Sequence, residues 1–301
     1  MLYFLQQALN GLHGGALYAL LAFGYVLTNG VLRRTNLAYG AVFAFGGQTM
    51  ILFAVFGWNV LWLSLPATVA FGVIVAFAYA LLVGKFLSRS VLAPLAARSP
   101  NAIVTATLGI AIALMEIGRI SAETRDFWLP PMLSDPVVFV ADTRFRVTLT
   151  VVQLLNCAIV VLVIAAGAAV LARSRFGREW RAVSDDAAAA ALSGVDTDRI
   201  FQRAVVGGAL VATIAGVLMA LYYGNVSFGT GLTYGLKVLF VTAVGGYHAP
   251  VRAAAGAALF GIAEAIWTGY FPVEWRDAAV FAALVALLVL RPESDARRET
   301  A

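Results

Sequence analysis

Long apolar runs separated by short polar segments dominate this chain of 301 residues. A helix needs about 20 consecutive, mostly apolar residues to cross the hydrocarbon core of a bilayer. Nine runs approach or exceed that length, near residues 5–29, 37–56, 60–84, 101–119, 147–172, 201–223, 233–247, 251–270 and 278–290. The pattern predicts an all-α, polytopic bundle of transmembrane helices. We expect eight or nine spans, because the seventh run is short.

Small residues recur every four positions inside several of these runs. Gly11 and Gly15 show the spacing in the first run, and Ala257 and Gly261 show it in the eighth. Helices in a bilayer associate largely through close packing of such residues, because lipid tails are as apolar as leucine. The spacing therefore predicts a tightly packed bundle.

One long polar, helix-forming stretch, residues 177–203, lies between two membrane-length runs. Trp180, Val183 and Ala187 recur in it at helical spacing. Gly194 ends a run of alanines and predicts a left-handed helix cap. A link of two to eight residues would join two spans more simply. A compact helical hairpin in this place therefore predicts a soluble partner.

Composition and charge agree with a membrane protein. Hydrophobic residues make up 61% of the chain and charged residues 12%, against roughly a quarter charged in soluble proteins. With nine spans and the N-terminus outside, fifteen of the 21 Lys and Arg residues fall on the inner side, as the positive-inside rule requires. The net charge of +5 is thus a topology signal and does not indicate nucleic-acid binding.

Two ionisable residues within or beside spans, Lys237 and Glu264, carry the strongest polar signal. Charges at membrane depth are costly and usually pair or face a cavity. We expect an ion pair between them, although direct substrate contact and exposure to headgroup water are alternatives.

The stretch 223–235 is rich in Gly, Ser and Thr, and the apolar run after it is short and ends at Gly246. This pattern indicates either a broken helix beside a substrate path or an outer loop followed by a tilted helix.

Catalytic and metal-binding patterns are missing. The chain contains neither Gly-x-Ser-x-Gly nor Gly-x-x-x-x-Gly-Lys-Ser/Thr, which argues against a serine nucleophile and against ATP hydrolysis by this chain. Its one cysteine, Cys157, lies in an apolar run, and neither His13 nor His248 has a carboxylate at metal-ligand spacing. An intramembrane enzyme is disfavoured, and no metal site is expected.

The polar stretch resembles the cytoplasmic coupling loop of ABC-importer permeases. Specifically, residues 176–199 are similar to the loop of branched-chain amino-acid (LivH-type) permeases, which contains Glu-Ala-Ala-x-x-x-Gly. Gly194 matches the glycine, and Ala189 and Ala190 match the alanines. Ala188 stands where the family has glutamate, so that Asp185 or Asp186 is the candidate substitute.

Other segments follow in the family's order, so the resemblance covers nearly the whole chain. Residues 32–40 resemble an Asn-Phe-Ala-His-Gly segment, with Tyr39 in place of histidine. Short matches continue at 106–109, 222–224, 235–237, 243–246 and 261–265.

The resemblance implies one permease domain over residues 1–301, with a coupling loop at 177–199 and a cytoplasmic tail at 291–301. Its expected partners are a second permease subunit, two ATPase subunits that hold ATP and Mg²⁺, a periplasmic binding protein and the lipid of a bacterial inner membrane. No cofactor is expected on this chain. An ion-coupled secondary transporter is the alternative.

Two groups of residues follow as candidates. The coupling candidates are Arg178, Arg181, Asp185, Asp186, Ala189, Ala190 and Gly194. The translocation-path candidates are Asn10, Asn36, Tyr39, Thr107, Lys237 and Glu264.

Overall fold

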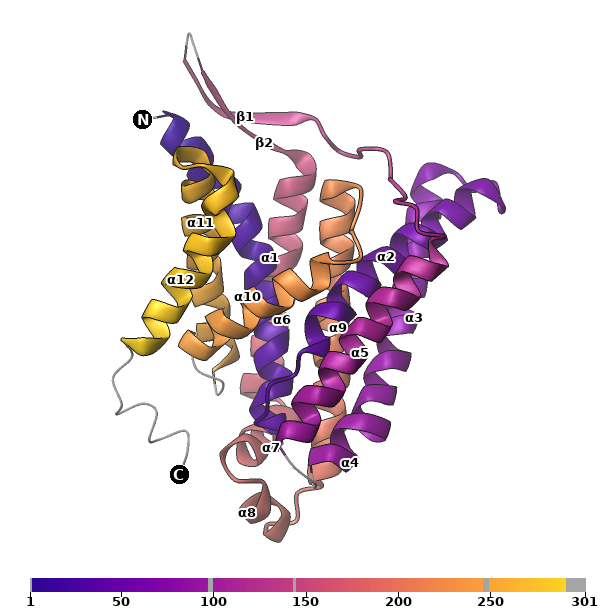
Figure 1. Ribbon diagram of the computed structural model, residues 1–301, viewed down its shortest axis with the longest axis vertical. Helices are drawn as coiled ribbons and strands as arrows, with labels where there is room; N and C mark the ends of the chain where they lie inside the picture. Colours follow the sequence, from indigo (N-terminus) through magenta and orange to yellow (C-terminus); the bar gives the residue numbers. More distant parts are fainter. Residues whose placement is uncertain (1, 97–99, 143–144, 246–248, 291–301) are drawn as a thin grey trace.

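The computed structural model describes residues 2–96, 100–142, 145–245 and 249–290, over which the chain is mostly helical (Figure 1). The tail 291–301, Gly246 and His248 lie outside the described residues. The elements are α1 (Leu2–Leu32), α2 (Ala38–Asn59), α3 (Leu65–Phe86), the π-helical turn η1 (Leu87–Leu92), α4 (Ala93–Ala96), α5 (Pro100–Ser121), β1 (Pro136–Ala141), β2 (Arg146–Thr150), α6 (Val151–Arg173), α7 (Arg175–Asp185), α8 (Ala187–Leu192), α9 (Thr197–Tyr223), α10 (Thr230–Gly245), α11 (Pro250–Tyr270), the 3₁₀ turn η2 (Val273–Trp275) and α12 (Arg276–Val289).

Within the described ranges, seven helical segments are long and apolar enough to cross a membrane. They are α1, α2, the continuous segment from α3 through α4, α5, α6, α9 and α11. The predicted runs 233–247 and 278–290 correspond to α10 and α12, which have only 16 and 14 residues. At 1.5 Å per residue these helices are about 24 and 21 Å long, less than the roughly 30 Å of hydrocarbon.

Three helices form the centre of the bundle. Most of the apolar length of α1, α2 and α9 is buried. Less than a third of the apolar length is buried in the segment from α3 through α4 and in α5, α6 and α11. The most extensive helix contact joins α1 to α11. A methyl group on Gly15 would collide with the backbone carbonyl of Ala258, and one on Gly261 would collide with the backbone of Gly15. The predicted tight packing is confirmed at this contact.

The all-α prediction was wrong for one segment, which forms an antiparallel hairpin of β1 and β2. Residues 147–150, predicted as the start of a span, belong to β2, and its Val147 and Leu149 are buried. The apolar Val147 and Leu149 alternate with threonines, as is typical of a half-buried strand. Helix α6 begins only where Thr150 and Gln153 form a reciprocal capping box.

The two ends of the bundle differ. Figure 1 shows the β-hairpin beside the start of α1 and the end of α11, while α7 and α8 project from the opposite end. The Tyr3 hydroxyl donates a hydrogen bond to the Gly269 carbonyl over 2.8 Å, which joins the outer ends of α1 and α11.

Candidate functional site

The polar stretch forms two short helices, α7 and α8, which we call the α7–α8 hairpin (Figure 1). The sequence predicted one helix before Gly194, but the extended Asp186 divides it. Helix α7 is amphipathic, because Trp180 and Val183 are buried whereas Arg178 and Asp185 are exposed. At the tip, Leu192 is 92% exposed. An apolar side chain in this position is suited to contact with another protein.

Asp186 begins α8. It is extended, with φ −153° and ψ 107°, and its Oδ1 accepts hydrogen bonds from the backbone N–H groups of Ala188 at 2.8 Å and Ala189 at 3.0 Å. The bonds from Ala189 and then Ala188 hold the pKa of the Asp186 carboxyl below its usual value. Both candidate substitutes for the family glutamate, Asp185 and Asp186, are exposed. The carboxylate of Asp186 is already bonded to the backbone of α8.

Gly194 ends α8 with a left-handed conformation, φ +82°. Its N–H donates to the Ala191 carbonyl at 3.0 Å, and the Val195 N–H donates to the Ala190 carbonyl at 3.1 Å. These two bonds form a Schellman motif, so the predicted glycine cap is confirmed. Ala190 is buried against the bundle, whereas Ala189 is exposed.

Side-chain hydrogen bonds attach α7 to the bundle. The Trp180 indole Nε1 donates to the Leu27 carbonyl of α1 at 2.9 Å. Arg181 Nη1 donates to the Leu171 carbonyl of α6 at 2.7 Å. Arg181 therefore contacts the bundle. The other arginine predicted for coupling, Arg178, is exposed.

Three of the predicted path residues gather where α2 begins. The Thr107 hydroxyl accepts a hydrogen bond from the Leu37 N–H at 3.2 Å, and Asn36 Oδ1 accepts one from the Ala38 N–H at 3.1 Å. The Tyr39 hydroxyl donates to the Leu21 carbonyl of α1 at 3.0 Å. All three predicted side chains are buried, and they tie α2 to α1 and α5.

Asn10 lies apart from that group. It sits in the first third of α1, where its Oδ1 accepts a hydrogen bond from Gln6 Nε2 at 3.0 Å. The same Gln6 side chain also pairs with the backbone of Thr148 in β2. The path candidates therefore do not form a single site.

Lys237 and Glu264 form the predicted ion pair, with Lys237 Nζ 2.6 Å from Glu264 Oε1. Lys237 Nζ is also 2.9 Å from Asp277 Oδ1. Arg276 completes the group, with Nε 3.2 Å from Asp277 Oδ1 and 3.5 Å from Glu264 Oε1. Two cations and two carboxylates thus join α10, α11 and α12. Sequence reasoning missed Arg276 and Asp277, because charges just before the last apolar run look like ordinary membrane-boundary residues.

Helix α10 is inserted among the central helices. In Figure 1 it lies obliquely across the bundle. A methyl group on Gly231 would come within 2.6 Å of the Gly40 carbonyl oxygen in α2, and one on Gly235 within 3.0 Å of Gly40 Cα. Helix α9 ends at Gly224, whose φ is +73°. The short α10 packed against α2 is the feature expected of a broken helix, and its oblique course after the segment 224–229 is the feature expected of an outer loop followed by a tilted helix.

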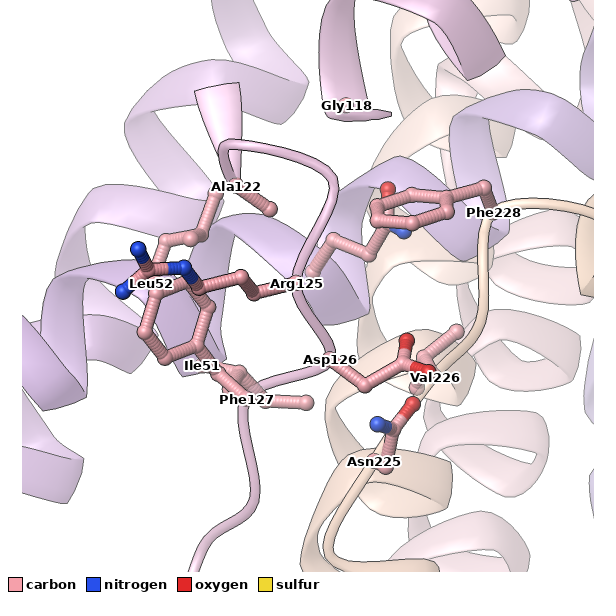
Figure 2. Close-up of a pocket in the computed structure, with 11 residues that line it drawn as sticks. Ile51, Leu52, Gly118, Ala122, Arg125, Asp126, Phe127, Asn225, Val226 and Phe228 are labelled. Carbon is pink, nitrogen blue, oxygen red and sulfur yellow. The ribbon is translucent and has the colours of Figure 1, made fainter. Parts of the chain in front are cut away.

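A pocket lies between α2, the end of α5 with the loop after it, and the segment that precedes α10 (Figure 2). Its polar lining consists of Gln48, Arg125, Asp126 and Asn225, and Figure 2 shows Asp126 and Asn225 directed toward one another. The apolar lining includes Ile51, Leu52, Phe127, Val226 and Phe228. Its volume is only about 20 Å³, which is room for about one water molecule, so the pocket is closed to an amino acid in this conformation.

Sequence reasoning missed Arg125 and Asp126 in this pocket. They sit in a loop outside every apolar run. The available signal was the Gly-, Ser- and Thr-rich stretch, because it contains Asn225 and Val226.

A second polar cluster is buried between α1, α6 and α9. Asn156 Nδ2 lies 3.2 Å from His13 Nε2 and donates to the Leu218 carbonyl at 3.0 Å. His13 and Tyr222 are in ring contact, with centroids 4.2 Å apart. Among the described residues, no three His, Cys, Asp or Glu side chains are grouped to hold a metal.

Comparison with known proteins decides the family. Residues 7–290 match the model for the permease component of branched-chain amino acid transport systems. This chain belongs to that family. The permease is 30% identical over 295 residues to the high-affinity branched-chain amino acid transport system permease protein LivH of Salmonella typhimurium and to LivH of Escherichia coli, with 97% of this chain and 94% of each relative covered. It is 29% identical over 294 residues to BraD of Pseudomonas aeruginosa, with 96% and 94% covered. No solved structure gives a significant match.

Family membership and the seven apolar helices identify this permease as a multi-pass membrane protein. The matched region contains the α7–α8 hairpin, α10, the four-charge group and the pocket. The candidate sites therefore lie inside the permease domain.

Proposed function

We propose that this chain is the non-catalytic transmembrane subunit of an ABC importer in a bacterial inner membrane. The observation that carries the proposal is the α7–α8 hairpin, a rigidly capped helical projection with an exposed apolar tip. Such a projection needs a soluble partner. In our proposal the hairpin, within the loop 177–199, docks on an ATPase subunit through Arg178, Asp185, Ala189 and Leu192.

The assembly contains a second permease subunit, two ATPase subunits that bind ATP and Mg²⁺, and a periplasmic binding protein. This chain needs no cofactor of its own and forms half of the translocation path. We count α10 and α12 as membrane-embedded elements, which gives nine helical elements in the bilayer. The short α10 is tolerated there because protein surrounds it.

The substrate is a branched-chain or related amino acid, by analogy with the names of the relatives. In the proposal the pocket beside α10, which has a volume of only about 20 Å³ in this conformation, widens during transport to admit the solute. It combines a guanidinium, a carboxylate and two amides with aliphatic and aromatic side chains. These groups suit the charged ends and the apolar side chain of a zwitterion. In the proposed path the solute passes this pocket and then α10, which the Lys237–Glu264 pair holds in place.

Reconstitution of the complete complex of five chains in vesicles tests the proposal. We expect uptake that requires ATP and all subunits. Gly194→Val should abolish substrate-stimulated ATP hydrolysis while insertion stays intact, because a β-branched residue at φ +82° is strained by roughly 1–3 kcal/mol. Gly194→Asn is the control, since asparagine tolerates this conformation.

Two results would contradict the proposal. One is normal stimulated ATP hydrolysis by the Gly194→Val complex. The other is uptake by the purified chain alone without ATP, which is the behaviour of an ion-coupled secondary transporter.

A further inference from the structure

We propose that Arg33 and Trp180 form a clamp that fastens the α7–α8 hairpin to α1, so that α1 transmits the motion of the ATPase subunits to the bundle. This inference rests on the proposed function. It assigns a positioning role to two residues, and it selects α1 among the three bundle helices that contact α7, which are α1, α6 and α9.

Trp180 supplies the first half of the clamp. Its side chain is 2% exposed and packs in a cluster with Phe23 and Leu27 of α1. Its indole N–H donates to the Leu27 carbonyl at 2.9 Å. A large buried aromatic with a satisfied polar group is an effective anchor, because it combines apolar contact with a fixed orientation.

Arg33 supplies the second half, directly after the end of α1. Its own backbone is left-handed, φ +51°, and its N–H donates to the Asn29 carbonyl at 2.7 Å. The guanidinium Nη2 then donates to the carbonyl of Ser184 at 2.6 Å and to that of Asp185. These carbonyls end α7, where intrahelical donors are missing and the helix dipole is negative. A guanidinium in that place donates to the unpaired carbonyls and interacts favourably with the negative end of the helix dipole.

The clamp therefore acts where α7 turns into α8. Asp186, the next residue, caps α8 and interacts with the charge of Arg33. A force on the exposed tip of α8 acts on this junction, and the junction is held by α1. An unusual backbone conformation maintained by such contacts indicates a functional constraint.

From α1 the motion has a defined route to the rest of the bundle. Gly15 of α1 is in backbone contact with Ala258 of α11, and this is the most extensive helix contact in the described chain. Helix α11 in turn holds α10 through Glu264 and Lys237. Tightly packed helices transmit displacement because their interfaces do not deform continuously.

The test compares substituted complexes in vesicles, with leucine as the substrate probe. Arg33→Asn removes the guanidinium while asparagine accommodates the left-handed backbone. Trp180→Phe keeps an aromatic ring but removes the N–H donor and part of the buried ring volume. Both should lower the substrate transported per ATP hydrolysed by about tenfold, within the range of known coupling factors. Arg34→Asn is the matched control, because Arg34 is exposed and its side chain bonds to the Arg33 carbonyl and not to α7 among the described residues. It should leave the ratio unchanged.

Further variants separate a mechanical role from a folding defect. Arg33→Lys retains a cation at the end of α7 and should restore most of the ratio. If Arg33→Asn prevents assembly, Trp180→Phe and Arg33→Lys decide the question by the same ratio in fully assembled complexes. A wild-type ratio in Arg33→Asn or in assembled Trp180→Phe would overturn the clamp while the importer proposal stands. Absence of ATP-dependent uptake by the wild-type complex would instead overturn the importer proposal.

Discussion

At the scale of single residues, Lys237 is the most constrained charge in the bundle. Its side chain is 2% exposed, and its ammonium group contacts carboxylates from α11 and α12. Moving an ion from water into a low-dielectric interior costs several kcal/mol unless partners compensate. Arg276 balances the second carboxylate, so the group of four is neutral. Its value to the protein is that it fixes α10 against two other helices.

The neutrality of this group makes a double-substitution experiment decisive. Lys237→Met alone leaves Glu264 and Asp277 facing a single cation, so we expect a loss of about 3–5 kcal/mol in the free energy of unfolding. Lys237→Met with Glu264→Met leaves the neutral Arg276–Asp277 pair and should recover much of that loss. Thermal unfolding of the purified protein measures both. Losses that simply add would show that Lys237 and Glu264 do not interact.

At the scale of elements, glycines determine which helices approach most closely. A methyl group on Gly15 would meet the Ala258 carbonyl, whereas one on the neighbouring Gly14 would meet nothing within 4 Å. Two adjacent residues of the same type thus have different roles. Their difference comes entirely from the direction in which the helix presents them to α11.

This pair allows a matched test of the contact between α1 and α11. Gly15→Ala should destabilise the protein by about 1–3 kcal/mol, because overpacking forces the backbones apart. Gly14→Ala should be neutral or stabilising by roughly 0.5–1 kcal/mol, since alanine is the better helix former. The midpoints of thermal unfolding compare the two variants. Equal effects would contradict the close contact.

At the scale of the whole molecule, the bundle has two chemically different ends. The β-hairpin lies at one end and the α7–α8 hairpin at the other (Figure 1). The bias of basic residues predicts that the α7–α8 end faces the cytoplasm. Helices α1, α2 and α9 form the buried centre between these ends, and the more exposed helices surround them.

Cysteine labelling tests this orientation in cells. After Cys157→Ala, a cysteine introduced as Val138→Cys in β1 should react with a membrane-impermeant maleimide from outside. One introduced as Ala189→Cys in α8 should react only after the inner membrane is opened. Both positions are exposed in the isolated chain. The chain is therefore expressed without its partner subunits, because the proposed docking would cover Ala189, and the side of the membrane then decides the labelling. The reverse pattern would show that the orientation is inverted.

The sequence by itself determined the features that depend on local residue pattern and on the depth of a residue in the membrane. Hydrophobic run lengths located the long helices, and a glycine after an alanine run located the cap at Gly194. The cost of a buried charge was enough to pair Lys237 with Glu264, because each needs an opposite charge at similar depth. The recurrence of small residues predicted the approach at Gly15.

Only the tertiary structure decided what depends on residues far apart in sequence. Contacts with Gln6, near the N-terminus, position the β-hairpin. Arg276 and Asp277 join the charged group only because α12 packs beside α10. The bonds from Arg33 to the end of α7 span about 150 residues of chain. Periodicity and charge predict which face of a helix must be buried, but many other segments of the chain could bury that face equally well. The packing of the whole bundle selects one of them.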